Sequence, residues 1–338
     1  MNLPPNTDLM RAAFAKAQSI LLTGPKGPDG DSIGACLALA RGMSRLTDAT
    51  VDVAGVANYR YDWMPGADTL LSDEDVGKDY DLVVVLDGDR TRLTPGVDKA
   101  FKAAKVRGII DHHGSTAATG YDVVTLDGNA TSTCEMVAAM LAHWGVPMDP
   151  IIATCIYTGV IFDTGGFRHS NTTPATHRLA AVLLEHGVDS SFINAKVLAE
   201  RTQAGLRMLG DVLANAEFVA DGAAVLGQLS LASAEAFGIS SGDFEGVIST
   251  LLNTTGVELA CVVTERKSGQ SKLSFRSRTT VNVARLAKSL DPGGGGHIRA
   301  SGVTLKEPFA AVVARLPEVL AAAIRSPDIP GDEVGASH

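Results

Sequence analysis

Acidic and imidazole side chains stand at the ends of four separated, regular stretches of this chain. The apolar run 106–110 leads directly into one such group, and the run 82–86 leads into another. A buried carboxylate stays ionised at low cost only when it is paired or bound to a cation. Carboxylate and imidazole together suit hard divalent ions such as Mn²⁺. The candidate set is Asp29, Asp31, Asp87, Asp111, His112, His113 and Asp163.

Short apolar runs with polar residues on both sides predict the buried strands that would position these groups. A helix over 97–104 separates the strands predicted at 80–87 and 105–111, so this segment predicts a parallel βαβ unit. Further strands are expected at 19–23, 51–55 and 121–126. Open α/β sheets place their sites at the carboxyl ends of such strands. The alternative is structural, in which Asp29 and Asp31 only form a turn, with Asp31 or Ser32 capping a helix that runs to about Leu46.

The pattern changes after residue 215, which indicates a second domain. A hairpin closed by Asp221-Gly222 is followed by strands predicted at 257–264 and 271–275, a helix at 283–290 and a glycine tract at 293–296. The predicted fold class is α/β, with a parallel-sheet domain followed by a smaller mixed α/β domain and the active site in the cleft between them. The predicted boundaries are 1–190 for the first domain, 191–210 for a helical linker, 211–325 for the second domain and 326–338 for a flexible tail.

Composition restricts the classes of partner. The net charge of −9 argues against a binder of long duplex nucleic acid, which usually carries a basic stripe. The four cysteines are far apart and match no zinc spacing, so buried free thiols are expected. The amino-terminal residues lack an apolar signal core, and no apolar segment is long enough to span a membrane. We therefore expect a cytoplasmic protein that does not bind membranes.

Five motifs, in this order, resemble the DHH phosphoesterase superfamily and its accompanying DHHA1 domain. They are PDGDSIG at 28–34, the strand end at Asp87, DHH at 111–113, DTGGF at 163–167 and GGGGH at 293–297. Their spacing is most similar to the NrnA-like branch, whose members degrade very short oligonucleotides, 3′-phosphoadenosine 5′-phosphate, or linear and cyclic dinucleotides. The resemblance covers roughly residues 19–325.

The resemblance implies a role for each residue of the first domain. Asp87 would bridge two divalent cations, with Mn²⁺ favoured and Mg²⁺ the alternative. Asp29 would hold the first ion, and the second would be held by Asp31, His112 and Asp163. His113 would contact the substrate phosphate and Asp111 would orient the neighbouring imidazole, so Asp87, Asp111, His112 and His113 form the predicted catalytic group.

The resemblance also implies that the second domain grips the substrate. Glycine runs let backbone N–H groups surround an anion, and a helix beginning near His297 would add positive potential. Arginine binds phosphate with two parallel hydrogen bonds. The predicted substrate contacts are His113, Arg168, Arg276, Gly294, Gly295, Gly296, His297 and Arg299.

One position departs from the resemblance. The family's first motif usually begins with a histidine three residues before the proline of PDGD, and Pro25 occupies that position here. Proline has no ligand atom, so the first metal site loses a usual ligand. The alternatives are that another ligand substitutes, that the first ion binds weakly, or that catalysis is impaired.

The expected function is metal-dependent hydrolysis of short oligonucleotides, cyclic or linear dinucleotides, or 3′-phosphoadenosine 5′-phosphate. Two alternatives stay open: a catalytically impaired nucleotide-binding regulator, motivated by Pro25, and an exonuclease on longer single strands, which the acidic charge disfavours. The expected partner is a small nucleotide or short oligonucleotide substrate. A homodimer is one assembly that the sequence leaves open.

Overall fold

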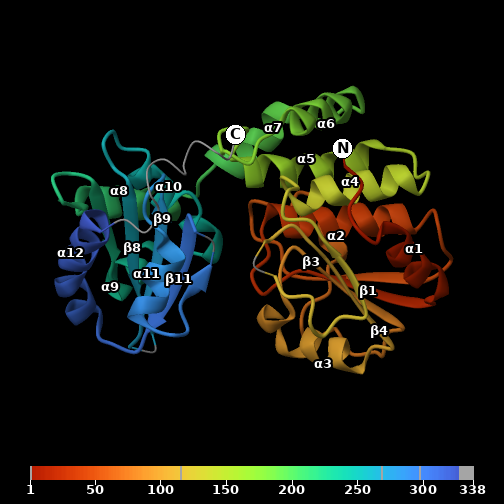
Figure 1. The fold of residues 1–338 in the computed structure, drawn as a ribbon, viewed down its shortest axis with the longest axis horizontal. Coiled ribbons are helices and arrows are strands. Elements are labelled where there is room, and N and C mark those ends of the chain that lie inside the picture. The colour runs from red at the N-terminus through yellow and green to blue at the C-terminus, as the bar shows by residue number, and fades with distance from the viewer. Residues whose placement is uncertain (1, 115, 268, 297, 327–338) are drawn as a thin grey trace. The chain divides into compact units, whose positions relative to one another are not determined.

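The computed structural model describes residues 2–114, 116–267, 269–296 and 298–326 (Figure 1). The chain forms two compact units, one ending at Glu200 and the other beginning at Arg201. His297 and the predicted tail beyond Ser326 lie outside the described residues. The domain boundaries given above stay predictions.

The first unit is built on a five-stranded sheet in which every neighbouring pair of strands is parallel, in the order β2-β1-β3-β4-β5. This confirms the predicted parallel sheet. The strands are β1 (Ser19–Thr23), β2 (Thr50–Ala54), β3 (Leu82–Leu86), β4 (Val106–Asp111) and β5 (Val123–Leu126).

Alternation along the strands divides the core of this unit into two layers. Leu82, Val84 and Leu86 of β3 face one apolar cluster, whereas Val83 and Val85 face the other. Figure 1 shows α2, α4 and α5 on one side of the sheet and α3 on the other. The helices are α1 (Thr7–Lys16), α2 (Gly30–Met43), α3 (Pro95–Ala103), α4 (Thr133–His143), α5 (Pro150–Thr164) and α6 (Pro174–Glu185), with 3₁₀ turns η1 (Ala67–Thr69) and η2 (Arg90–Arg92).

The start of α2 differs from the sequence expectation. The cap is Asp29, not Asp31 or Ser32, because its carboxylate accepts hydrogen bonds from the backbone N–H groups of Asp31 and Ser32, each at 3.1 Å. Asp31 is therefore inside the first turn of the helix and fully buried. The helix also ends earlier than expected, at Met43 rather than near Leu46.

The predicted helical linker is interrupted. It contains α7 (Ser190–Asn194), a π-helical turn η3 (Ala195–Ala199) and, after a break, α8 (Gln203–Ala214). The guanidinium of Arg60, which is buried, donates to the carbonyl of Val197 at 2.9 Å. The aromatic segment 59–63 thus packs into the first unit, with Tyr61 fully buried against Phe162.

The second unit contains a mixed six-stranded sheet in the order β10-β11-β9-β8-β7-β6. Strands β7 and β8 are parallel and the other pairs are antiparallel. The predicted hairpin is confirmed as β6 and β7. The strands are β6 (Glu217–Val219), β7 (Ala224–Leu229), β8 (Leu259–Glu265), β9 (Ser271–Ser277), β10 (Gly295–Gly296) and β11 (Ala300–Leu305).

Each face of this second sheet has its own apolar cluster. Leu259, Cys261 and Val263 of β8 belong to one cluster, and Ala260 and Val262 belong to the other. The remaining helices of the unit are α9 (Leu231–Phe237), the 3₁₀ turn η4 (Ser241–Phe244), α10 (Val247–Leu252), α11 (Val283–Leu290) and α12 (Phe309–Arg325).

Two sequence expectations about the chain as a whole can be compared with the described residues. All four cysteines are buried free thiols, as expected. Among the described helices, none combines the length and the apolar character needed to cross a bilayer.

Candidate metal centre

The carboxyl ends of β3 and β4 bring the first candidate side chains together. The two strands pair as far as Leu86 and Ile110, and the N–H of Asp87 then donates to the carbonyl of Ile110 at 3.1 Å. Asp87 adopts a left-handed backbone conformation, with φ of 59°, which turns the chain sharply at the strand end. Asp87 therefore lies directly beside the Asp111–His113 segment.

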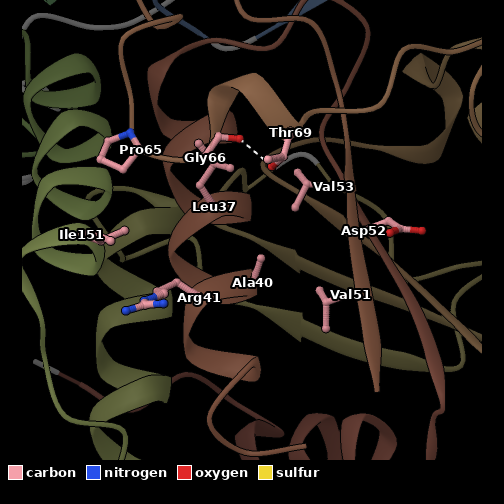
Figure 2. Close-up of a pocket in the computed structure, with 10 residues that line it drawn as sticks. All are labelled: Leu37, Ala40, Arg41, Val51, Asp52, Val53, Pro65, Gly66, Thr69 and Ile151. Carbon is pink, nitrogen blue, oxygen red and sulfur yellow. Dashed lines mark hydrogen bonds between the residues drawn. The ribbon is translucent and has the colours of Figure 1, made fainter. Parts of the chain in front are cut away.

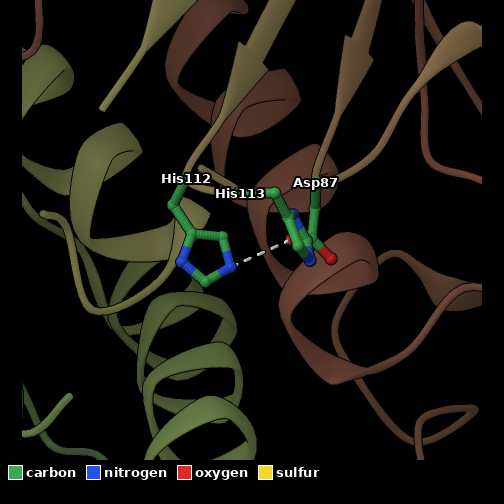
Figure 3. A group of neighbouring side chains, drawn as sticks. All are labelled: Asp87, His112 and His113. Carbon is green, nitrogen blue, oxygen red and sulfur yellow. Dashed lines mark ion pairs between the residues drawn. The ribbon is translucent and has the colours of Figure 1, made fainter. Parts of the chain in front are cut away.

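Asp87, His112 and His113 form one group whose potential ligand atoms all lie within 4.8 Å of one another (Figure 3). Asp87 Oδ1 is 3.6 Å from His112 Nε2 and 3.8 Å from His113 Nδ1. Asp87 is buried, with 4% of its surface exposed, while both imidazoles are partly exposed. The group can offer ligands to a cation that enters from the imidazole side.

Asp31, His112 and Asp163 form a second group with the same spacing. His112 Nε2 lies 3.0 Å from Asp163 Oδ2, but this buried oxygen has no partner with hydrogen-bond geometry among the described residues. A carboxylate oxygen in this position, with an imidazole and a second carboxylate beside it, fits a divalent cation.

The ring nitrogens of both imidazoles are oriented by neighbouring groups. His112 Nδ1 lies 3.3 Å from the carbonyl of Ala130, which can only accept, so Nδ1 carries the proton and Nε2 points to the acids. His113 Nδ1 lies 2.6 Å from Asp111 Oδ1. Asp111 is fully buried and also accepts from Thr116. Asp111 thus contacts the imidazole of His113.

The acids strongly perturb one another in the metal-free protein. Burial, followed by the charges of Asp31, Asp29 and Asp163, raises the pKa of Asp87 well above its usual value. Burial and the charge of Asp31 raise the pKa of Asp163 to about 7. Burial opposes ionisation of Asp111, yet its hydrogen bonds from His113 and Thr116 outweigh burial and lower its pKa. A bound cation would relieve this repulsion, so the group of acids is suited to a divalent ion.

The charge of His112 predicts a pH-dependent metal affinity. Burial opposes its protonation, but Asp163 and the other acids outweigh burial and raise the pKa of His112 to about 10. A metal ligand must be deprotonated, so each ion that binds Nε2 displaces this proton. We expect the affinity for Mn²⁺ to rise with pH, by about tenfold per pH unit for one displaced proton.

Calorimetric titration between about pH 6 and pH 8, in buffers of different ionisation enthalpy, measures both the affinity and the proton release. His112→Gln should lower the release by the proton that His112 loses. His143→Gln is the matched control. His143 lies in α4 and pairs with Asp8 of α1 at 2.9 Å, and neither residue belongs to the two ligand groups. An affinity that stays constant over this pH range would contradict the prediction.

Asp29 and Pro25 stand apart from the two three-residue groups. Asp29 uses Oδ1 to cap α2, and burial followed by the charge of Asp31 raises its pKa, so it lies within the same field of acids. The ring of Pro25 packs on the backbone after Asp87, since a Cβ added at Gly88 would lie 3.1 Å from Pro25 Cγ. Pro25 therefore borders the site but brings no ligand atom to it.

The predicted substrate contacts are distributed over both units. Arg168 is exposed in the first unit, and its Nε donates to the carbonyl of Gly165 at 2.5 Å. Arg276 lies on β9 with burial lowering its pKa, and no carboxylate among the described residues forms an ion pair with it. Arg299 donates to the carbonyl of Val281 at 3.4 Å.

The glycine tract does not lead into a helix where the structure describes it. Gly295 and Gly296 instead form the short strand β10 against β11, and Gly296 has φ of 136°, a conformation that favours glycine. A Cβ at Gly296 would lie 2.5 Å from the carbonyl oxygen of Ala300, so the close approach of the two strands requires glycine. Gly294 donates to the carbonyl of Asp291 at 2.8 Å. His297 lies outside the described residues, and the described residues on its two sides form the paired strands β10 and β11.

Several residues at the site were missed by the sequence analysis. The N–H groups of Thr133 and Cys134, at the start of α4, donate to Asp31 at 2.7 and 2.9 Å. Asn171 donates to the carbonyls of Thr131, at 3.1 Å, and Asp163, at 3.3 Å. The Ser-Thr-Cys-Glu stretch at 132–135 carries a capping signature that could have located the helix start, since Ser132 accepts from the N–H of Glu135.

A separate surface pocket of about 350 Å³ contains none of these residues (Figure 2). Its two charged side chains are already paired, Arg41 with Asp149 at 3.0 Å and Asp52 with Lys78 at 2.6 Å. The pocket therefore offers a ligand no unpaired charge. Its lining comprises Leu37, Ala40, Arg41, Val51, Asp52, Val53, Pro65, Gly66, Thr69 and Ile151.

Comparisons with known proteins agree with this arrangement. Residues 19–160 match the DHH family, N-terminal domain, and residues 228–326 match the DHHA1 domain. The chain is 32% identical, over 283 residues, to the bifunctional oligoribonuclease and PAP phosphatase NrnA of Thermus thermophilus, with 82% of each chain covered. It is 25% identical over 329 residues to the cyclic-di-AMP phosphodiesterase GdpP of Geobacillus thermodenitrificans, covering 88% of this chain and 46% of that longer protein.

A solved structure supports the fold along almost the whole chain. The exopolyphosphatase-related protein from Bacteroides fragilis superposes with a TM-score of 0.84 at 26% identity, covering 94% of this chain and 96% of that chain. Two successive domain matches and a relative of this similarity establish the family. With its parallel first sheet, its acids and imidazoles at the strand ends and its mixed second sheet, this chain belongs to the NrnA-like branch of the DHH/DHHA1 phosphoesterases.

Proposed function

We propose that this protein is a metal-dependent phosphoesterase that hydrolyses short oligonucleotides, linear or cyclic dinucleotides, or 3′-phosphoadenosine 5′-phosphate. The observation that carries the proposal is the group Asp31, His112 and Asp163, whose potential ligand atoms all lie within 4.8 Å of one another. The names of the relatives support the substrate classes, because one is an oligoribonuclease and PAP phosphatase and another a cyclic-di-AMP phosphodiesterase.

We assign two divalent cations to the acids, with Mn²⁺ favoured because the ligand set includes imidazole. Asp87 would bridge them, Asp29 would hold the first, and the second would be held by Asp31, His112 and Asp163. When bound, such a pair polarises a phosphoryl group and lowers the pKa of a water molecule. In the reaction, a new bond forms from the oxygen of water to phosphorus, the ester P–O bond breaks, and the leaving oxygen takes a proton.

His113 and Asp111 would stabilise the charge that develops on the phosphoryl oxygens. Asp111 lies 2.6 Å from His113 Nδ1, so we assign the contact with substrate to Nε2 of the same ring. Arg168 would add a positive charge to the first unit near residues 163–167.

In the second unit we assign substrate contacts to Arg276, Arg299, His297 and the glycine tract 294–296. Arg276 is the strongest of these assignments, because its half-buried guanidinium has no acidic partner among the described residues and a bound anion would balance its charge. Its planar donors would match a terminal phosphate.

We predict that Arg276→Ala raises KM by about tenfold or more and leaves the affinity for Mn²⁺ unchanged, since a hydrogen bond to a charged group contributes about 1.5–3 kcal/mol. Steady-state kinetics and calorimetry together measure this separation. Arg266→Ala in the same unit is a control, as Arg266 directly follows the end of β8 and does not lie on β9. An unchanged KM for the Arg276 variant would remove Arg276 from the substrate site.

Pro25 makes the two cation positions unequal in this proposal. The first position would have Asp29 and the shared Asp87, without the histidine usual in the family, and so would bind its ion more weakly than the second. We predict that Pro25→His strengthens the weaker of the two Mn²⁺ binding steps by about tenfold. Changes to a metal ligand, or to a group that orients one, typically alter metal affinity by about this factor. Calorimetry of wild type and variant measures the two steps.

Pro25→Ala is the matched control, because alanine removes the ring without supplying a ligand atom. If Pro25→His and Pro25→Ala bind Mn²⁺ equally, another group already serves the first position. If both variants bind as wild type does, the ring itself has no influence on the site.

A screen of hydrolysis with Mn²⁺ tests the proposed function directly. The substrates are 3′-phosphoadenosine 5′-phosphate, linear dinucleotides, cyclic dinucleotides and twenty-nucleotide single strands. We expect turnover of at least one of the small substrates and little of the long strands, because the net charge of −9 disfavours long nucleic acid. Binding without turnover would favour the alternative of a nucleotide-binding regulator, which Pro25 motivates.

The cytoplasmic location and a homodimer stay predictions from the sequence.

A further inference from the structure

The first turn of α4 contacts two of the acids at once. A helix begins with N–H groups that have no partner inside the helix. Here the N–H of Thr133 donates to Asp31 Oδ2 at 2.7 Å and the N–H of Cys134 donates to Asp31 Oδ1 at 2.9 Å. Both oxygens of Asp31 are therefore held by backbone, and the amino end of the helix favours their negative charge.

The side chain of Thr133 reaches the other acid. Its hydroxyl donates to Asp87 Oδ1 at 3.2 Å, and Thr133 and Asp87 are both buried. Asp87 Oδ1 is the same atom that lies 3.6 Å from His112 Nε2. Thr133 thus touches one carboxylate through its backbone and the second through its hydroxyl.

Helix stability does not require this hydroxyl. The cap of α4 is Ser132, whose side chain accepts from the N–H of Glu135 at 3.0 Å, while Glu135 in turn accepts from the N–H of Thr131 at 3.0 Å. The local hydrogen bonds of the helix start are complete without the Thr133 hydroxyl. The partner of that hydroxyl is a residue 46 positions away in the sequence.

We propose that Thr133 is a positioning residue for metal binding: its hydroxyl fixes the orientation of the Asp87 carboxylate relative to Asp31. This inference rests on the proposed cation site. A carboxylate that is free to rotate offers its lone pairs to a cation less often, and groups that orient ligands typically change metal affinity by about 10–100-fold when they are removed. Because backbone N–H groups hold Asp31, substitution of the Thr133 side chain leaves that contact in place.

The experiment is calorimetric titration of the full chain with Mn²⁺, using Thr133→Val, which keeps the shape and loses the hydroxyl, and Thr133→Ser, which keeps the hydroxyl. We expect the valine variant to bind its first Mn²⁺ about tenfold more weakly and the serine variant to bind within about twofold of wild type. Thr158→Val is the matched control, since Thr158 is an equally buried threonine whose hydroxyl donates within its own helix, to Thr154, at 2.8 Å.

The outcomes separate the two claims. If wild type binds no Mn²⁺, both the proposed function and this inference are wrong. If wild type binds Mn²⁺ and Thr133→Val binds it equally well, only the role of Thr133 is wrong. Thermal unfolding without metal shows whether the variants fold. Should Thr133→Val not fold, the comparison passes to Thr133→Ala and Thr133→Ser, and equal affinity of these two overturns the inference.

Discussion

Replacing Asp87 with asparagine should lower kcat/KM by about three orders of magnitude or more, because the proposed bridging ligand loses its charge. Asparagine has the size of aspartate, can accept the hydrogen bond from Thr133, and tolerates the left-handed backbone at this position, where φ is 59°. The substitution therefore removes charge with little change in shape. Steady-state kinetics with Mn²⁺ and the best substrate of the screen measures the loss.

The same substitution should stabilise the metal-free fold. In the folded chain burial and the neighbouring carboxylates raise the pKa of Asp87 well above its unfolded value. At neutral pH, folding must therefore bury an unfavourable charge or take up a proton, and either lowers the stability of the wild type. The advantage of the variant should disappear below about pH 4, where aspartate is protonated in both states.

Asp122→Asn is the control for both measurements, since Asp122 is a surface carboxylate paired with Arg107 at 2.9 Å. It should change activity by no more than about twofold. An Asp87→Asn variant that keeps substantial turnover would show that Asp87 is not the bridge. A variant that loses activity together with metal-free stability would show a structural defect instead.

The sequence predicted the strand ends of this site because the pattern there is local. Residues 82–86 and 106–110 are apolar and bounded by polar residues, and parallel strands connected through a helix have adjacent carboxyl ends. The roles of Asp31, His112 and Asp163 came from the motif resemblance, since neither periodicity nor composition identifies ligands. Their assignment to metal stays a proposal, although the structure brings them within 4.8 Å.

Contacts between residues distant in the sequence could not be predicted. The N–H groups of Thr133 and Cys134 meet Asp31 across about a hundred positions, and no pattern in a single sequence encodes that pairing. The cap of α2 was misassigned for a related reason. Asp29, Asp31 and Ser32 are all good capping residues, and only the packing of Asp31 against α4 leaves Asp29 for the role.

The sequence predicted the mixed α/β class of the second unit but not the conformation of its glycine tract. Four glycines impose no conformation, so the tract allowed a helix start as readily as a strand. Pairing of Gly295 with Gly302 and of Gly296 with Ser301 decides in favour of the strand β10, and that pairing depends on β11. The strand predicted at 271–275 stopped one residue before Arg276, whereas β9 continues to Ser277 and includes it.

Gly159→Ala should have the largest effect on stability of the substitutions considered, and it should also weaken Mn²⁺ binding. A Cβ at Gly159 of α5 would lie 2.4 Å from Cys134 Sγ and 2.5 Å from Asp31 Oδ1. It would also lie 2.9 Å from the Cα of Asp31, so rotation of one side chain cannot relieve the clash. The helices α2 and α5 must separate, and overpacking of this kind costs about 1–3 kcal/mol.

The movement should displace Asp31 from the N–H groups of α4 and hence from His112 and Asp163. We therefore expect a lower free energy of unfolding in urea and a Kd for Mn²⁺ raised by at least about tenfold. Gly210→Ala is the matched control, because Gly210 is an exposed glycine of α8 whose added Cβ would meet nothing within 4 Å. That control should raise stability by about 0.5–1 kcal/mol, as alanine is the better helix former. If Gly159→Ala is as stable as wild type and binds Mn²⁺ equally, the close packing of α5 on Asp31 does not position the metal ligand.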